Sequence, residues 1–433
     1  MRGVGAGGIS PRVSTRIWAG IAAALIGIAV GSLAACSAAR SSGSSGSHTS
    51  SRTPSGTAVT SGTATTSATA KPVAASGSSP CARSGGPALA YEAVSSTLES
   101  ITVGIRCGLG STLIAGVDSS GYEVSVAWSA DDSQLAWIDS NDGSMTVVTF
   151  TAGKVATRRH WACPTFFGCF GIAFLGERAV TTAQPTAFPE LVVYPASGTG
   201  APTIVPMTGL PPYASSQGGA RFELLGSTPS SLVIEWGEQS SANTFLALLY
   251  HVDAAGHAIA YETTKLVNGA DRINSSPAFN QFVFGSDIPC GNGTGQRQTV
   301  DLMNAATGAI SRPALPAGQP GYLVQGTWFD PSGTPYVSLA PAIAACMTHS
   351  AGTGQAGVAP VVCKLVNGTW VKTGSGVFQA AYGPGNWLAE ETGMTGQDGP
   401  EHSLTISNGS SRTTIAGVLG FAWAGFPATE AAA

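Results

Sequence analysis

The residues whose types and spacing come closest to a metal site are His251, Asp253 and His257, in the segment HVDAAGH. Two imidazoles and a carboxylate are suitable ligands for a transition metal. The same segment also reads as a polar turn between two strands, with Gly256 where a tight turn needs a positive φ. We favour the turn, and we predict no metal site and no cofactor for this chain.

The chain carries no motif of the common hydrolases, nucleotide-binding proteins or zinc proteases. Residues 81–433 contain no G-x-S-x-G, no H-E-x-x-H, no phosphate-binding loop and no C-x-x-C. Each of these motifs holds a nucleophile, a metal or a phosphate at a fixed point of a turn or helix. We therefore predict no catalytic residues and favour a protein without enzymatic activity.

The first 36 residues combine basic residues, a long uncharged run and a cysteine. Arg2, Arg12 and Arg16 precede the run IWAGIAAALIGIAVGSLAAC, and no acid occurs before residue 80. The ending Leu-Ala-Ala-Cys resembles the lipobox of bacterial lipoproteins, in which signal peptidase cuts before a cysteine that is then acylated. The resemblance implies a signal peptide at residues 1–35 and lipidation, with chains such as palmitate, at Cys36. The alternatives are a retained transmembrane anchor and plain secretion.

Residues 36–80 form a compositionally distinct segment. Beyond the cysteine they are mostly Ser, Thr, Gly and Ala, with hardly any bulky side chain. Such a segment cannot bury enough apolar surface to offset the entropy lost on ordering. We therefore expect a flexible linker between the lipid anchor and a folded domain at residues 81–433.

Seven further cysteines lie in the domain, and an exported protein is expected to pair them as disulfides. We predict one bond within a short loop, one between neighbouring repeats and one near the start of the domain: Cys163–Cys169, Cys290–Cys346 and Cys81–Cys107. Cys363 alternates with apolar residues in VVCKLV, which predicts a buried free thiol. A Cys346–Cys363 bond is the alternative.

An apolar strand, a bulky residue, a polar turn and a second strand recur along the domain. The bulky residues are 41 to 54 positions apart: Trp128, Phe174, Leu225, Phe279, Phe329, Tyr382 and Trp423. A second series marks a later hairpin in each unit: Gly110, Gly153, Gly198, Gly256, Gly308, Gly368 and Gly409. Periods of this length with several strands each are typical of β-propeller blades, so we predict an all-β, seven-bladed propeller, with six or eight blades as alternatives.

The two series are out of phase in a way that predicts how the ring closes. The first glycine turn precedes the first bulky residue, and no glycine turn follows Trp423. The C-terminal segment GVLGFAWAGF would then supply the inner strand of a blade whose other strands are ALAYEAV, SITVGIRC and STLIAGV. Pairing of the two chain ends would remove the exposed sheet edges of an open array.

One repeat carries a resemblance to known propellers. The segment VAWSADDSQLAWI is similar to the W-S-P-D-G-x-x-I/L-A-F repeat of TolB-type and WD-type propellers, and FDPSGTPYVSL is similar more loosely. The resemblance implies a seven-bladed propeller over residues 81–433. Propellers bind ligands at the mouth of the central channel. Because Glu235, Trp236 and Asp287 stand where two second strands are expected to end, we predict that they contribute to a ligand-binding surface there.

The charge of the domain limits its partners. All 24 acidic residues lie beyond residue 80, whereas six of the 20 basic residues precede it, which leaves the domain a formal charge of about −10. This charge argues against nucleic acid as a partner. We expect a monomer, attached to the membrane through its lipid, with an envelope protein or a glycan as partner.

Together these features predict a lipid-anchored β-propeller on the extracytoplasmic face of the cell membrane. Its function would be that of a non-catalytic ligand-binding or protein-interaction scaffold at the cell envelope. The alternative is an extracellular enzyme, carbohydrate-active or other, that uses the propeller channel. Two or more acids grouped with an arginine or histidine in the channel would favour that alternative.

Overall fold

Strands make up almost all of the regular structure. The computed structural model describes residues 79–424 except 83, 85, 95–99, 111, 119–123, 140–142, 165–168, 184–188, 197–198, 212–219, 229, 242–243, 262–265, 291–295, 318–320, 343–356 and 395–401. These residues form 28 β-strands and one short 3-10 turn, η1 (Pro384–Asn386). The predicted signal peptide, Cys36 and nearly all of the predicted linker lie outside the described residues. Within the described part, no helix is long and apolar enough to cross a membrane.

The strands form seven four-stranded antiparallel blades. The inner strands, from blade 1 to blade 7, are β28 (Val418–Trp423), β4 (Val124–Trp128), β8 (Cys169–Leu175), β12 (Ala220–Ser227), β16 (Leu266–Ser275), β20 (Tyr322–Phe329) and β24 (Val377–Tyr382). The second strands are β1 (Ala88–Val94), β5 (Gln134–Asp139), β9 (Arg178–Ala183), β13 (Leu232–Ser241), β17 (Gln281–Pro289), β21 (Pro335–Pro341) and β25 (Leu388–Thr392).

The outer half of each blade completes the sheet. The third strands are β2 (Ile101–Cys107), β6 (Met145–Thr151), β10 (Glu190–Val193), β14 (Thr244–Val252), β18 (Gln296–Asn304), β22 (Val361–Val366) and β26 (Ser403–Asn408). The outer strands are β3 (Thr112–Asp118), β7 (Lys154–Trp161), β11 (Thr203–Pro206), β15 (Ala258–Ala260), β19 (Ile310–Ser311), β23 (Thr369–Ser375) and β27 (Ser411–Ala416). Blades 4 and 5 are also joined into one sheet, because β14 pairs with β16.

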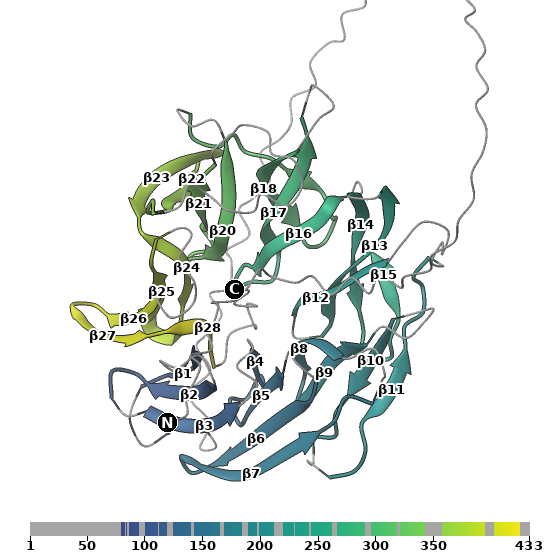
Figure 1. Ribbon diagram of the computed structural model, residues 1–433, viewed down its shortest axis with the longest axis vertical. Coiled ribbons are helices and arrows are strands. Elements are labelled where there is room, and N and C mark those ends of the chain that lie inside the picture. Colours follow the sequence, from purple (N-terminus) through teal and green to yellow (C-terminus); the bar gives the residue numbers. More distant parts are fainter. Residues whose placement is uncertain are drawn as a thin grey trace, which may run out of the picture. The chain divides into compact units, whose positions relative to one another are not determined.

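The blades close into a ring. Each inner strand contacts the next, in the order β28, β4, β8, β12, β16, β20 and β24, and β24 contacts β28 again. Figure 1 shows the sheets following one another around this ring, with the inner strands toward its centre. The domain is therefore a seven-bladed β-propeller, as the repeat predicted.

The predicted closure by the chain ends is confirmed. Strand β28 pairs with β1 in an antiparallel register that sets Leu89 opposite Trp423 and Tyr91 opposite Phe421. The N-terminal strands β1, β2 and β3 complete this blade, so blade 1 combines the two ends of the domain.

Burial explains why the inner strands are so apolar and the outer ones are not. A blade has a neighbour on both faces, so the inner and second strands are covered twice and show little alternation, as in the second strand β1, ALAYEAV, whose first five residues are all buried. By contrast, the outer strand KVATRRHW is exposed along most of its length. The basic residues Arg158 and Arg159 on this edge disfavour pairing with another chain.

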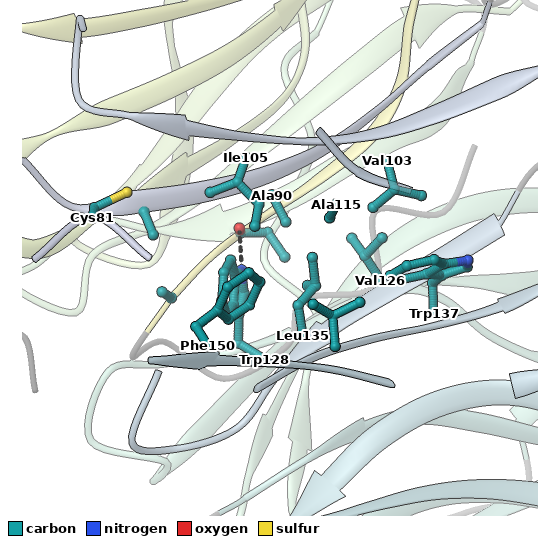
Figure 2. Packing of buried hydrophobic residues seen from close by; sticks show 14 of the residues in the cluster. Cys81, Ala90, Val103, Ile105, Ala115, Val126, Trp128, Leu135, Trp137 and Phe150 are labelled. Atoms are coloured by element: carbon teal, nitrogen blue, oxygen red, sulfur yellow. Dashed lines mark hydrogen bonds between the residues drawn. The ribbon is translucent and has the colours of Figure 1, made fainter. Parts of the chain in front are cut away.

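The core lies between neighbouring blades, and Figure 2 shows the packing between blades 1 and 2. Trp128 and Phe150 pack together with ring centroids 5.9 Å apart, and Val103 and Ile105 of blade 1 belong to the same buried cluster. The indole Nε1 of Trp128 donates a hydrogen bond to the carbonyl oxygen of Ala422 in β28, at 3.0 Å. This bond joins blade 2 to the strand that closes the ring.

The two series of repeat markers correspond to two kinds of turn. Most of the bulky residues end an inner strand or lie just before its end, but Phe279 lies in the turn after β16 with a φ of 52°. The later glycines have positive φ in the hairpins before the outer strands, as predicted, at Gly153, Gly256, Gly308, Gly368 and Gly409. In the first hairpin the positive φ belongs to Gly108 and not to Gly110, and Gly198 lies outside the described residues.

Candidate functional site

A pocket lies where the inner strands of blades 5, 6, 7 and 1 end. Strands β16, β20, β24 and β28 end at Ser275, Phe329, Tyr382 and Trp423, and all four residues line the pocket. The space it encloses, together with the open solvent at its mouth, is about 500 Å³, and its wall comprises Asn274, Ser275, Pro277, Trp328, Phe329, Asp330, Pro331, Ala380, Ala381, Tyr382 and Trp423. Because the inner strands of a propeller run in the same direction, their ends meet on one side of the ring and form a site across four blades.

The aromatic rings of the pocket are held by contacts behind them. The indole of Trp328 stacks on Tyr336, with centroids 5.7 Å apart and planes 12° apart. Nε1 of Trp423 donates to the carbonyl oxygen of Ala381 at 3.0 Å. A Cβ at Gly383 would lie 2.6 Å from the ring of Trp423, so the glycine leaves room for the indole. These contacts fix the rings before any ligand enters, which lowers the entropic cost of binding.

Two polar side chains of the wall are oriented by the backbone. Oδ1 of Asp330 accepts hydrogen bonds from the amides of Ser332 and Thr334, both at 2.9 Å, and thereby shapes its turn. Nδ2 of Asn274 donates to the carbonyl oxygen of Thr327 at 2.7 Å, which fixes the orientation of the amide. Oδ1 of Asn274 is buried and has no hydrogen-bond partner among the described residues.

Acidic side chains lie near Tyr382 at the edge of the pocket. Burial raises the pKa of Tyr382, and the nearby groups Tyr336, Asp330 and Glu390 raise it further. Burial also raises the pKa of Glu390. The phenol of Tyr382 is therefore held in its neutral form, in which it can donate a hydrogen bond.

Glu235 and Trp236 do not lie in this pocket. Strand β13 continues to Ser241, so both residues lie within the strand, and the expectation that they end it is wrong. The exposed fractions of the two residues are 0% and 5%. Nε1 of Trp236 donates to the carbonyl oxygen of Pro211 at 3.3 Å, and its ring meets Phe222 edge-on. The polar residues after Trp236 stay in the strand because they pair with β14.

Asp287 also lies apart from the pocket. It is half-buried near the end of β17, opposite Val267 of the inner strand. Second strands run antiparallel to inner strands, so the end of β17 lies on the side of the ring away from the pocket. The structure therefore does not bring Asp287 to the site described here, and a ligand contact at this residue stays a prediction.

Two predicted disulfides are present. Cys81 and Cys107 are bonded with Cα atoms 5.3 Å apart, which ties the segment before β1 to the end of β2. Cys163 and Cys169 are bonded with Cα atoms 5.7 Å apart, across the connection from blade 2 to blade 3.

The remaining cysteines behave differently. Cys290 is disulfide-bonded, and its predicted partner, Cys346, lies outside the described residues. Cys363 is a free thiol with an exposed fraction of 0%, and burial raises its pKa to about 11. The alternative bond between Cys346 and Cys363 is therefore wrong.

The segment HVDAAGH is a hairpin turn. Oδ1 of Asp253 accepts from the amides of Ala255 and His257, at 2.8 and 2.9 Å, and Oδ2 lies 3.1 Å from Nδ1 of His257. His251 instead packs its ring against Tyr261. In the part of the chain that the structure describes, no three His, Cys, Asp or Glu side chains are grouped to hold a metal.

A histidine and a glutamate form a close pair in blade 7. Nδ1 of His402 lies 2.6 Å from Oε1 of Glu391, and the side chains are 12% and 11% exposed. The imidazole packs on Phe378, and its Nε2 is buried without a hydrogen-bond partner among the described residues. A carboxylate that orients an imidazole is found in catalytic sites. Here, however, Nε2 has no access to solvent, so the pair acts as a packing element of the blade.

Acidic residues of blades 2 and 3 meet at the turns after the inner strands. Glu177 is exposed as a whole residue, but partial desolvation of its carboxyl group, a hydrogen bond with Asp131 and the charge of Asp131 raise its pKa to about 7. Burial and the charge of Asp131 raise the pKa of Asp132 to about 6. The pair joins turns of two blades on the side of the ring that also holds the pocket.

Three residues that line the pocket were noted in the sequence, but not as parts of a site. Phe329, Tyr382 and Trp423 served as markers of the repeat, and their aromatic character was read as packing. A partial signal is positional: aromatic residues end the inner strands of four consecutive blades, 6, 7, 1 and 2, and the first three of them line the pocket whereas Trp128 of blade 2 does not. Asn274 and Asp330 gave no such signal, since polar residues are common beside turns.

Comparison with known proteins bears on the fold. No protein-family model and no curated protein matches the chain. Among solved structures, TolB from Acinetobacter baumannii is 14% identical with a TM-score of 0.39, over 67% of this chain and 64% of that chain. The match thus spans less than two thirds of the TolB chain.

Two further structures are similar at the same level. A protein from Lactobacillus plantarum is 13% identical with a TM-score of 0.48, over 78% of this chain and 99% of that one. The β-propeller domain of the Trilobed protease from Pyrococcus furiosus is 10% identical with a TM-score of 0.42, over 66% and 77%. From its own seven blades, the closed ring and the inner strand supplied by the C-terminal strand β28, the described domain is a seven-bladed β-propeller.

Proposed function

We propose that this protein is a lipid-anchored, extracytoplasmic binding propeller that holds its ligand in the pocket at the ends of β16, β20, β24 and β28. The observation that carries the proposal is the pocket itself, a concave site with fixed aromatic rings and a few oriented polar groups. Such a combination is typical of sites that bind small molecules or protruding side chains.

The contacts in the pocket support binding rather than catalysis. Oδ1 of Asp330 already accepts three hydrogen bonds from its own turn, including one from Oγ of Ser332 at 2.6 Å. A carboxylate committed in this way supplies charge and position and is poorly placed to accept a further proton. We therefore do not propose the alternative of an enzyme that acts through the channel.

The binding role is tested by a pair of tyrosine variants in the soluble domain, residues 81–433. Tyr382→Ala removes a half-buried ring from the pocket, whereas Tyr261→Ala removes a half-buried ring that packs on His251 outside it. The measurement is the amount of envelope glycan or envelope protein that each domain retains on an affinity column. We expect Tyr382→Ala to lose retention of the envelope ligand and Tyr261→Ala to keep it. Equal retention by both variants would contradict the proposal.

The anchor is tested separately. Replacing Cys36 with Ser removes the thiol that the acyl chain requires, so we expect the protein to leave the membrane fraction or to accumulate uncut. Normal maturation and unchanged partitioning into detergent would contradict the proposed lipidation. This result would leave the binding role of the propeller intact.

A further inference from the structure

We propose that the pocket takes an organic cation, whose alkylammonium group lies against the aromatic rings and beside the carboxylate of Asp330. This inference rests on the binding function proposed above and names the chemical class of the ligand. It follows from three properties of the wall: its charge, its aromatic surface and one unsatisfied oxygen.

The charge of the wall has one sign. Among the described residues that line the pocket, Asp330 carries a charge and none is a lysine, arginine or histidine. Glu390 is near enough to Tyr382 to raise the pKa of that phenol, so a second carboxylate contributes to the field at the pocket edge. A domain with a formal charge of about −10 adds a long-range attraction for cations.

The aromatic surface suits the same ligand. Tyr336 stacks on the indole of Trp328 and does not line the pocket, whereas Trp328, which is 5% exposed, does. Tyr382 and Trp423 add two more rings from the next two blades. A cation within about 6 Å of an aromatic face is attracted by its quadrupole, and indole is the strongest of the natural rings.

The unsatisfied oxygen calls for a partner with positive charge or a donor. Asn274 is 4% exposed, and its amide is oriented by the bond from Nδ2 to Thr327. Asn274 lines the site, and its buried Oδ1 has no hydrogen-bond partner among the described residues, a state that is costly for a buried acceptor. Neutral sugars could also donate hydrogen bonds to this oxygen and to the carboxylate of Asp330, but only a cation gains the Coulomb attraction of a wall and a domain with negative charge, which favours a cation.

The test compares choline with 3,3-dimethylbutan-1-ol, in which a carbon atom replaces the charged nitrogen and the shape is unchanged. Binding to the soluble propeller is measured by calorimetry and by saturation-transfer NMR. We expect saturable binding of choline and at least about tenfold weaker binding of the neutral analogue, the factor that one unpaired favourable charge contact costs. Added salt should weaken the binding of choline and leave that of the alcohol unchanged.

Two matched variants assign the effect to the pocket. Asp330→Asn removes the charge and keeps the oxygen that caps the turn, and we expect about tenfold weaker binding of choline. Asp253→Asn makes the same chemical change in a similar turn of an outer hairpin and should leave binding unchanged. Equal melting temperatures of the two variants would show that neither substitution unfolds the domain.

The outcomes separate this inference from the function on which it rests. Equal binding of choline and its neutral analogue, absence of saturable choline binding, or tighter binding of glucose would overturn the cation. If Tyr382→Ala still abolished retention of an envelope ligand, the proposed binding function would be supported although the ligand would not be a cation. Tighter binding of Nα-acetyl-lysinamide than of choline would support a cation and identify a protein side chain as its source.

Discussion

The hydrogen bond from Trp128 to the carbonyl oxygen of Ala422 joins two parts of the chain that are almost 300 residues apart, at the seam of the ring. Trp128→Phe keeps an aromatic ring but removes the donor. Trp128 is 5% exposed, so the carbonyl oxygen would be left buried, at a cost of about 1–3 kcal/mol. The smaller ring also leaves part of its contact with Phe150 unfilled, for about 1 kcal/mol more. We expect the free energy of unfolding to fall by about 3 kcal/mol.

A second tryptophan provides the matched control. Nε1 of Trp161 donates to the carbonyl oxygen of Gly200 at 3.1 Å, also between neighbouring blades, but in an exposed setting. Water can replace that donor, so Trp161→Phe should cost less than about 1 kcal/mol. Denaturation by urea, followed by circular dichroism, gives both changes, provided that the slope of the transition stays constant.

The comparison of the two variants also gives the refuting result. If Trp128→Phe and Trp161→Phe lower the urea midpoint by equal amounts, the buried bond at the seam contributes no more than a surface bond. Ring closure would then depend on the pairing of β28 with β1 alone, and the reasoning about the seam would be wrong.

Three further predictions follow from the same structure. Deletion of residues 416–433 removes β28 from between blades 7 and 2, and limited proteolysis should show a susceptible domain without cooperative unfolding; a cooperative transition at the parent temperature would contradict this. Desolvation of Glu177 and its hydrogen bond to Asp131 raise the pKa of Glu177 to about 7, so the fold has its full stability below about pH 4.5 and loses part of it as the pH rises through about 7; the difference in melting temperature between pH 5 and pH 8 should shrink in Glu177→Gln and would be unchanged if the reasoning is wrong. Arg312→Ala leaves the carboxylate of Asp301 buried without its counter-ion, which should lower the free energy of unfolding by about 3 kcal/mol at pH 7. The loss should be smaller at pH 4, where the acid can take up a proton, and a loss independent of pH would count against this account.

The architecture was predictable because each blade repeats the same physical requirements. An inner strand needs apolar residues on both faces, a bulky residue fills the space at its end, and the hairpin before the outer strand needs positive φ. These requirements recur at positions such as Trp128 and Gly153, so two independent series gave the same number of blades. Their difference in phase revealed the closure by Trp423, since an open array would have ended with a glycine turn.

The pocket, by contrast, could not be predicted, because the repeated packing requirements hide which residues face a ligand. A residue such as Tyr382 satisfies the packing rule of its own blade whether or not it faces a ligand, and the sequence of one blade carries no information about the next. The site arises from four strand ends that are between 41 and 54 residues apart in the sequence and meet only after the ring has closed. Conversely, Glu235 was expected at the mouth of the channel because the polar residues after it suggested the end of a second strand, but β13 continues to Ser241 and Glu235 is 0% exposed.

Strand β28 has two roles that link stability to binding. Its residue Ala422 accepts the bond from blade 2, and the next residue, Trp423, bonds to blade 7 and lines the pocket. A ligand in the pocket therefore contacts a strand that is in place only when the ring is closed. Because such a ligand binds the folded state alone, it stabilises the closed ring by about 2.7 kcal/mol at a concentration one hundred times its dissociation constant. This gain is close to the cost expected for breaking the bond of Trp128, so an occupied pocket would offset the loss of that contact at the seam.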